Sequence, residues 1–197
     1  MQRLVFATGN KDKVRELKEI LDGSFEVVSM KELGISPDID ENGETFEENA
    51  LIKARTLCQL TGQLAVADDS GLVIDALNGE PGVHSARFMG EDTSYTIKNT
   101  KLIEMMEGYQ GEERSARFVC VIACVFPDGR EWTCRGEMEG QIGYEIQGEN
   151  GFGYDPIFFL PEYGCTSAQL SREGKNEISH RGKAMRMMRD RLQGDRQ

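Results

Sequence analysis

A glycine, two polar residues and two lysines follow the first apolar run of the sequence and would suit an anion. The stretch ATGNKDK, residues 7–13, comes after Leu4–Phe6 and directly before a segment with helical spacing. Backbone amides at a helix N-terminus attract anions, and Thr8, Asn10 and Lys13 would add donors and charge. The spacing is neither that of a P-loop nor that of a dinucleotide-binding fold. Taken alone, the stretch fits an ordinary strand-to-helix turn as well as a phosphate site.

Asp68 ends the apolar run LAVAD, and a second carboxylate, Asp69, follows it directly before Ser70. We expect a short strand to deliver them into a turn, where α/β enzymes present carboxylates. Mg²⁺ binds one or two carboxylates together with several waters, and a carboxylate beside such a water can take its proton. A turn that merely caps a strand uses the same residue types. The pair alone therefore does not decide between catalysis and turn chemistry.

Lys53 stands on an otherwise apolar face of a predicted helix. A lysine there either extends its ammonium to water along the apolar surface or contacts a phosphate. The acidic cluster that precedes this helix suits the positive end of the helix dipole. One member of that cluster, Glu41, is also a candidate metal ligand.

Two further motifs in the second half of the chain fit the recognition of a base. In GFGYDP, residues 151–156, glycines flank Phe152, and an exposed aromatic ring can stack on a purine. In SHRG, residues 179–182, Ser179 fits a helix N-cap, while His180 and Arg181 are either ordinary surface residues or hydrogen-bond donors to a base edge. Together, the phosphate-type loop, the carboxylate pair, the aromatic ring and the donor pair describe a nucleotide with its Mg²⁺.

The composition is that of one acidic globular domain. The chain has 197 residues and a net charge of −11, which argues against binding to nucleic acid or to a membrane surface. We find no signal peptide and no apolar stretch long enough to span a membrane. Five cysteines without framework spacing indicate reduced thiols and a cytoplasmic protein, and a zinc site is not expected.

The apolar periodicity predicts alternating strands and helices early in the chain and a β-hairpin later. A capping box formed by Thr45 and Glu48 marks the start of the second helix. The expected helices are 11–21, 45–60, 93–106 and 179–192. The expected strands are 4–7, 25–29, 64–68, 71–77, 116–126 and 130–142, with a further apolar strand near 157–160. The fold class is therefore α/β, a mixed sheet in one domain over 1–197, and residues 193–197 are expected to fray.

The sequence resembles the inosine triphosphate pyrophosphatase family. The resemblance rests on ATGNKDKVREL, TFEENALIKA, ADDSGL, PGVHSARF, GFGYDPIFF and EISHRGKA, which occur in the family's order from residue 7 to residue 184. It implies an elongated, twisted mixed sheet flanked by helices, with two lobes and a central cleft, and a homodimer. It also implies hydrolysis of ITP, dITP or XTP to the monophosphate and pyrophosphate, which clears deaminated purines from the nucleotide pool.

The resemblance also implies a role for each motif residue. Asp69 would be the general base and a Mg²⁺ ligand, with Asp68 and Glu41 as further metal-site carboxylates. The substrate would be bound by Thr8, Gly9, Asn10, Lys11, Asp12, Lys13, Lys53, Ser70, Phe152, Gly153, Tyr154, Asp155, Lys175, His180 and Arg181. Within this set, Asn10, Lys13 and Lys53 would contact phosphate, Phe152 would stack on the base, and Lys175, His180 and Arg181 would read its edge.

Two alternatives stay open. One is a related nucleotide pyrophosphatase that prefers pyrimidine or modified nucleotides, against which the SHRG block argues. The other is a nucleotide-binding module that does not hydrolyse, which Asp69 and the two phosphate lysines disfavour.

Overall fold

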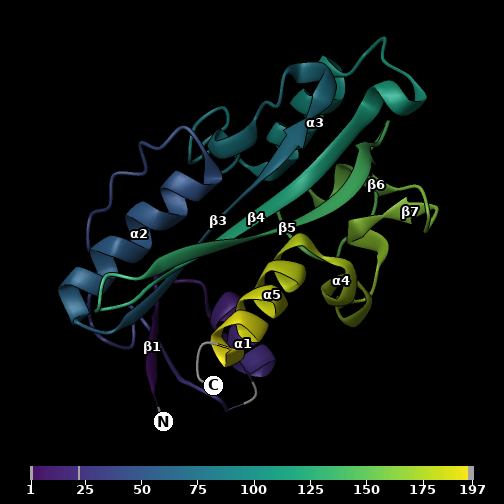
Figure 1. Ribbon diagram of the computed structural model, residues 1–197. Helices are drawn as coiled ribbons and strands as arrows, with labels where there is room; N and C mark the ends of the chain where they lie inside the picture. Colours follow the sequence, from purple (N-terminus) through teal and green to yellow (C-terminus); the bar gives the residue numbers. More distant parts are fainter. Residues whose placement is uncertain (1, 22, 195–197) are drawn as a thin grey trace. The chain divides into compact units, whose positions relative to one another are not determined.

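The computed structural model describes residues 2–21 and 23–194, except for the side chain of Asp12. Its described strands form a mixed sheet in the order β2-β1-β3-β4-β5-β6-β7 (Figure 1). The strands are β1 (Arg3–Phe6), β2 (Glu26–Ser29), β3 (Leu64–Ile74), β4 (Ser115–Val125), β5 (Glu131–Ile142), β6 (Phe158–Leu160) and β7 (Cys165–Thr166). Strand β1 is parallel to β2 and β3, whereas β6 is antiparallel to β5 and β7. The predicted mixed α/β class is confirmed.

The α-helices are α1 (Lys11–Leu21), α2 (Phe46–Thr61), α3 (Tyr95–Met105), α4 (Arg172–Ile178) and α5 (His180–Gly194). The predicted capping box of α2 is present: the Thr45 hydroxyl accepts from the Glu48 amide, and the Glu48 carboxylate accepts from the Thr45 amide. Gly62 ends α2 in the left-handed region, at φ 64°, where a side chain would be strained. The helix that begins at Lys11 has its predicted bounds.

Two compact units share the chain. The first contains residues 1–69, 120–136 and 183–197, and the second contains 70–119 and 137–182. The chain passes between the units four times, and each passage falls inside a regular element, namely β3, β4, β5 and α5. The two units are therefore interleaved and share strands β3, β4 and β5.

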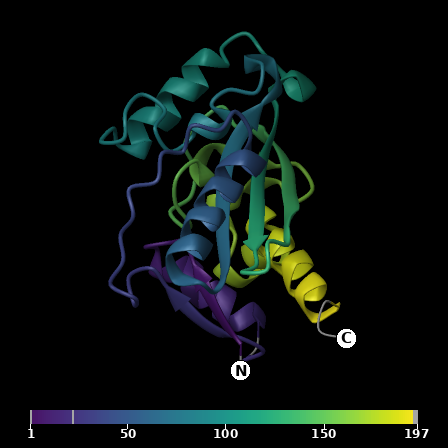
Figure 2. The same ribbon diagram turned by 60° about the vertical axis from the view of Figure 1, so that its left-hand side comes forward.

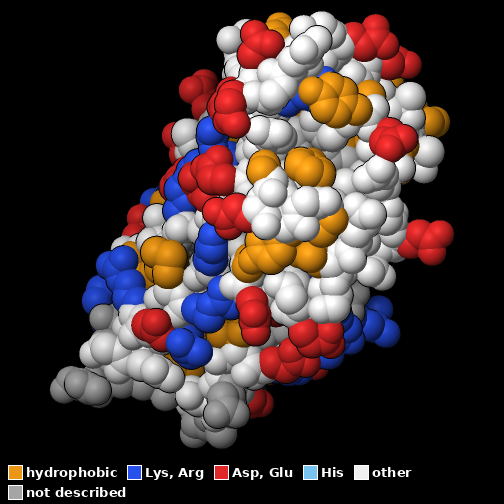
Figure 3. Space-filling view, turned by 90° about the vertical axis from the view of Figure 1, so that its right-hand side faces the viewer, with side chains coloured by type: hydrophobic (Ala, Val, Ile, Leu, Met, Phe, Trp, Pro, Cys, Tyr) orange, Lys and Arg blue, Asp and Glu red, His pale blue; other side chains and the backbone are white. Residues whose placement is uncertain are grey.

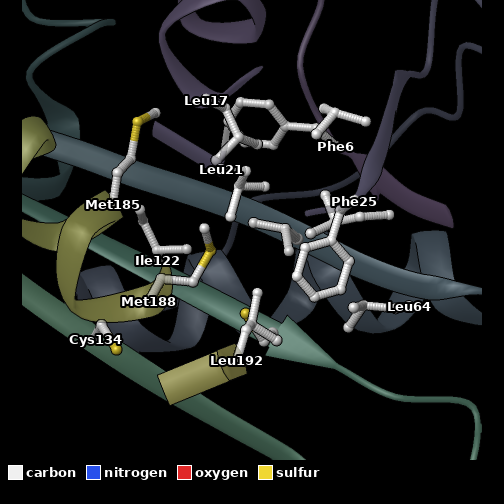
Figure 4. Close-up of a cluster of buried hydrophobic side chains, with 14 of the residues drawn as sticks. Phe6, Leu17, Leu21, Phe25, Leu64, Ile122, Cys134, Met185, Met188 and Leu192 are labelled. Atoms are coloured by element: carbon white, nitrogen blue, oxygen red, sulfur yellow. The ribbon is translucent and has the colours of Figure 1, made fainter. Parts of the chain in front are cut away.

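Strand alternation builds the core of the first unit. Leu64 and Val66 of β3 point to the face on which α1 and α5 lie, and they pack with Leu17 and Met188 in one buried cluster (Figure 4). Helix α2 lies against the other face of these strands (Figures 1 and 2), and its buried residues include Ala50, Ala54 and Leu57. The strands of this unit are thus covered on both faces, which fits their near-continuous burial.

In the core of the second unit, α3 packs with the parts of β3, β4 and β5 that belong to this unit. Its cluster includes Leu102 and Met106 with Phe118 and Phe158. Arg114 is buried there, at 3% exposure, and donates to the carbonyls of Met106, Tyr109, Ile142 and Gly143. These bonds join the end of α3 to the end of β5.

Three sequence-based expectations need correction. Residues 64–68 and 71–77 are not two strands, because β3 continues from Leu64 to Ile74. Helix α4 was not predicted; its seven residues are mostly polar, so no apolar period marks it. Residues 193 and 194 belong to α5 and do not fray, while 195–197 lie outside the described residues.

On the face shown in Figure 3, hydrophobic side chains stand singly or in small groups among acidic and basic ones. Among the described helices, none combines the length and the hydropathy that a membrane span requires.

Candidate active site

The loop between β1 and α1 uses its polar side chains to organise its own backbone. The Thr8 hydroxyl accepts from the Asn10 amide at 3.1 Å, and the Asn10 side-chain oxygen accepts from the Lys13 amide at 3.3 Å. Thr8 is buried, whereas Asn10 and Lys11 are exposed. The loop is therefore a capped helix N-terminus, as the sequence indicated. The Asp12 side chain lies outside the described residues.

Lys13 forms an ion pair with Asp68. Its Nζ lies 2.7 Å from Asp68 Oδ2, and the Asp68 side chain is 1% exposed. This contact ties the first turn of α1 to β3. A carboxylate so deeply buried depends on such a partner.

Lys53 lies between two other carboxylates. Its Nζ is 2.7 Å from Glu41 Oε2 and 3.1 Å from Asp69 Oδ1. Burial raises the pKa of Asp69 to about 6, against the charge of Lys53, which lowers it. Burial lowers the pKa of Lys53, but the charges of Asp69, Asp68 and Glu41 together outweigh it and raise this pKa above its usual value. Asp69 thus combines low solvent access with a raised proton affinity, as is typical of catalytic carboxylates.

The two aspartates do not stand at the end of a strand in a turn, which corrects the predicted geometry. They are consecutive residues inside β3, so their side chains leave opposite faces: Asp68 toward α1 and Asp69 toward α2. Strand β1 is paired with β3 only as far as Val66, and then the phosphate-type loop begins. Both carboxylates therefore lie just past the end of β1, where the strand edge on that side is no longer covered by β1.

The carboxylates provide a partial set of ligands for a divalent cation. Among the described residues, no group of three or more His, Cys, Asp or Glu side chains is close enough to hold a metal. Glu41 and Asp69 meet at the Lys53 ammonium, so this spot attracts positive charge, and Asp69 Oδ2 is buried with no hydrogen-bond partner of normal geometry among the described residues. Two carboxylates with an open oxygen fit the way Mg²⁺ binds. Asp68 faces the other side of β3 and is held by Lys13.

The remaining candidate residues, apart from Ser70, gather around Phe152 in the second unit. The Phe152 ring is 59% exposed, and the cations of Lys175 and Arg181 lie over it at 5.3 and 5.5 Å from the ring centroid. His180 is buried and stacks on Phe118 at 4.9 Å between ring centroids. Ser70 is a half-buried residue of β3. An exposed aromatic ring flanked by two cations suits a flat, electron-rich ligand.

The Asp155 carboxylate holds both Phe152 and Lys175 in place. Its side chain is buried, and its Oδ2 accepts from the Phe152 amide at 2.9 Å and from Lys175 Nζ. Its Oδ1 accepts from the Ser167 hydroxyl at 2.8 Å. Tyr154 is also buried. The side chains of Tyr154 and Asp155 thus position the loop, whereas Phe152 presents the exposed surface.

Three supporting residues were missed by the sequence reasoning. Asn99 of α3 donates to the Gly153 carbonyl at 3.1 Å, the Ser85 carbonyl accepts from the Tyr154 hydroxyl at 2.6 Å, and Ser167 holds Asp155. The motif PGVHSARF contains Ser85 and was the available signal. Nothing in the local pattern marks Asn99, because it contacts the loop across 54 residues of sequence.

Known proteins resemble this chain over nearly its full length. The model of the Ham1 family matches residues 4–191. A curated protein of Geobacter sulfurreducens named dITP/XTP pyrophosphatase is 49% identical over 193 residues, which cover 98% of this chain and 97% of that protein. One of the same name from Desulforamulus reducens is 51% identical over 185 residues, covering 93% and 92%. The structure of a HAM1 protein from Coxiella burnetii has a TM-score of 0.93 at 42% identity and covers 98% of this chain and 100% of that chain.

Proposed function

This chain belongs to the Ham1 family, and on that premise we propose that it hydrolyses the non-standard purine nucleoside triphosphates ITP, dITP and XTP to the monophosphate and pyrophosphate. The observation that carries the proposal is the group of Asp69, Lys53 and Glu41 beside the loop that follows β1. It provides a base of raised pKa and a phosphate-binding cation at one point. Its biological role would be to remove deaminated purines before they are incorporated into nucleic acid.

In this proposal the triphosphate is bound near the loop that follows β1. Lys13 and Lys53 supply two positive charges, and the amides at the N-terminus of α1 supply hydrogen-bond donors. Thr8, Gly9, Asn10, Lys11 and Asp12 complete the loop in this proposal. Phosphoanhydride hydrolysis depends more on such charge neutralisation and positioning than on covalent chemistry.

Asp69 acts as the general base. Its ionised carboxylate takes a proton from a water, the water oxygen forms a bond to the α-phosphorus, and the α–β bridging bond breaks. Pyrophosphate then leaves with the bonding electron pair. A pKa of about 6 keeps the carboxylate ionised at neutral pH and still basic enough to accept the proton.

Mg²⁺ is the cofactor in this proposal, held by Asp69 and Glu41, with Asp68 as a more remote carboxylate. A bound Mg²⁺ would neutralise phosphate charge and lower the pKa of its waters. Glu41 and Asp69 already converge on one cation, Lys53 Nζ, which supports their assignment as ligands.

In this proposal the residues around Phe152 recognise the base. Phe152 stacks on the purine, and Lys175, His180 and Arg181 read its edge. Hypoxanthine and xanthine carry a carbonyl where adenine carries an amine. The carbonyl accepts hydrogen bonds from donors such as His180 and Arg181. The adenine amine is itself a donor, so it leaves these side chains without an acceptor, and ATP is rejected.

A pyrophosphate-release assay with ITP, XTP, GTP, ATP and dUTP, with and without Mg²⁺, tests the proposal. We expect turnover of ITP and XTP that depends on Mg²⁺ and little turnover of ATP or dUTP. Equal rates on ATP and ITP would contradict purine editing, and a preference for dUTP would favour a pyrimidine pyrophosphatase. If no nucleotide is hydrolysed, the hydrolytic function is contradicted and a non-hydrolysing binding module is the alternative. We further propose that the protein is cytoplasmic and forms a homodimer. Size-exclusion chromatography with light scattering tests the dimer.

A further inference from the structure

A pocket lies on the side of α1 that faces the residues after β2. It has a volume of about 480 Å³ and belongs wholly to the first unit. Its lining residues are Gly9, Lys11, Val14, Arg15, Lys18, Glu19, Ser29, Lys31 and Glu32. A cavity of this size accommodates a small molecule. Apart from Gly9 and Lys11, none of these residues has a role in the proposed nucleotide site.

The charge of this pocket is opposite to that of the protein. Among its described lining residues, four are basic and two are acidic, in a chain with a net charge of −11. Two of the basic residues are engaged, because Lys18 lies 3.2 Å from Glu32 and Arg15 lies 4.0 Å from Glu19. The Glu32 carboxylate also accepts from the amide and the hydroxyl of Ser29, which lowers its pKa and keeps it ionised.

The other two basic residues of the pocket are Lys31 and Lys11, of which Lys11 also belongs to the loop of the proposed nucleotide site. Within the part of the chain that the structure describes, the side chains of Lys11 and Lys31 form no ion pair or hydrogen bond. Both line the pocket and both are exposed. Two ammonium groups match the charge of a phosphate dianion, and a lysine binds phosphate as a point charge.

The pocket is separate from the ion pairs of Asp68 and Asp69 with Lys13 and Lys53. Lys13, Lys53, Asp68 and Asp69 are not among its lining residues. It touches the nucleotide site only through the backbone loop that contains Gly9 and Lys11. An anion here would contact the loop from the side of β2, whereas Lys13 is turned toward Asp68 of β3.

We propose that this pocket is a second anion site, which binds inorganic phosphate or pyrophosphate next to the phosphate loop. Because Gly9 belongs to both sites, the occupant restrains the loop that positions Lys13. The inference concerns binding of the free anion and does not rest on the hydrolytic function. Inorganic phosphate and pyrophosphate share the chemistry that the two lysines recognise, and pyrophosphate is a product of the proposed reaction.

The test is a backbone amide NMR titration of the metal-free full chain with inorganic phosphate and, separately, with pyrophosphate. We expect saturable shifts at Gly9, Arg15, Ser29 and Lys31. Lys31→Glu should lower the affinity reported by these amides at least tenfold. The matched control is Lys101→Glu, which makes the same charge change at an exposed lysine of α3 and should leave the affinity unchanged. If the shifts saturate with pyrophosphate but not with phosphate, the occupant is the reaction product pyrophosphate. If they saturate with both, the pocket is a general phosphate site.

Turnover of ITP by Lys31→Glu separates this site from the nucleotide site. We expect the rate of the unmodified protein, because Lys31 is outside the nucleotide site. Shifts confined to Lys13, Lys53 and Asp69 would overturn the proposal, since the anion would then bind only among the catalytic residues. The same holds if Lys31→Glu loses ITP turnover together with anion binding, because the pocket would then be part of the substrate site. A chain that shows the pocket shifts but no turnover would contradict the proposed function alone.

Discussion

Asp68 and Asp69 are neighbours in β3, yet their carboxylates leave opposite faces of the strand and each pairs with a lysine from a different helix. Asp68 binds Lys13 of α1 at 2.7 Å, and Asp69 binds Lys53 of α2 at 3.1 Å. Strand β1 pairs with β3 only as far as Val66, so both ion pairs lie on the part of β3 that extends beyond β1. The backbone thus fixes the separation of the two pairs, and neither lysine can substitute for the other.

Asp69→Asn should abolish turnover and retain nucleotide binding. The amide has nearly the shape of the carboxylate but cannot take a proton, so we expect the kcat for ITP to fall by about 10²–10⁴-fold. Single-turnover kinetics and fluorescence titration with a labelled nucleotide measure the two properties. Asp38→Asn, which changes an exposed carboxylate, is the control. A near-normal rate in Asp69→Asn would remove Asp69 from the role of base.

The contribution of Asp69 to the stability of the metal-free protein should fall as the pH rises from about 4 to 6. The pKa of Asp69 is about 6 in the folded chain and about 4 in an unfolded one. The folded state therefore binds this proton more tightly, and ionisation costs stability. Asp69→Asn should be more stable than the unmodified protein at pH 8, by roughly 1–3 kcal/mol. The gain should disappear toward pH 4, as urea unfolding in the presence of a chelator would measure. A gain that does not vary with pH would contradict this linkage.

Lys53→Met should destabilise the metal-free protein and increase its response to Mg²⁺. Removing the ammonium leaves Glu41 and Asp69 without their shared partner, at a cost of about 3 kcal/mol. A divalent cation would then replace the lost charge. We expect the Mg²⁺-induced rise in Tm to be larger in Lys53→Met than in the unmodified protein or in Lys101→Met. Equal shifts in all three proteins would exclude Glu41 and Asp69 as metal ligands.

Arg181→Ala should reduce the preference for ITP over ATP. The guanidinium lies over Phe152, where a purine edge would meet it. In the variant, bound adenine no longer faces an unpaired donor at this position. The ratio of kcat/KM for ITP to kcat/KM for ATP should therefore fall about tenfold or more. Arg172→Ala, at an exposed position of α4, is the matched control. If the ratio persists, the discrimination resides in other residues.

Local sequence patterns predicted much of the fold because they reflect local physics. The apolar spacing of residues 11–21 and the capping box at Thr45 are decided within one or two helical turns, and the structure has both. The continuous β3 was missed because Asp68, Asp69 and Ser70 look like a turn. Ion pairs from both sides and burial keep these polar residues within the strand.

The candidate residues could be found from the sequence, but not the partners that orient them. Asp155 looked like a pocket residue, and only the fold shows that Ser167 and Lys175 hold its buried carboxylate. Asn99 has no local signal at all, because its role depends on a contact with Gly153. Pairings between distant segments follow from tertiary packing, which periodicity does not encode.

The four passages between the two units all fall inside β3, β4, β5 and α5. A protease therefore finds no linker whose cleavage would release one unit whole. An expressed fragment such as residues 1–69 would lack the parts of β4, β5 and α5 that complete its core. Recombination could not exchange the first unit for another without breaking hydrogen-bonded strands. The two units have to be synthesised, folded and inherited as one piece.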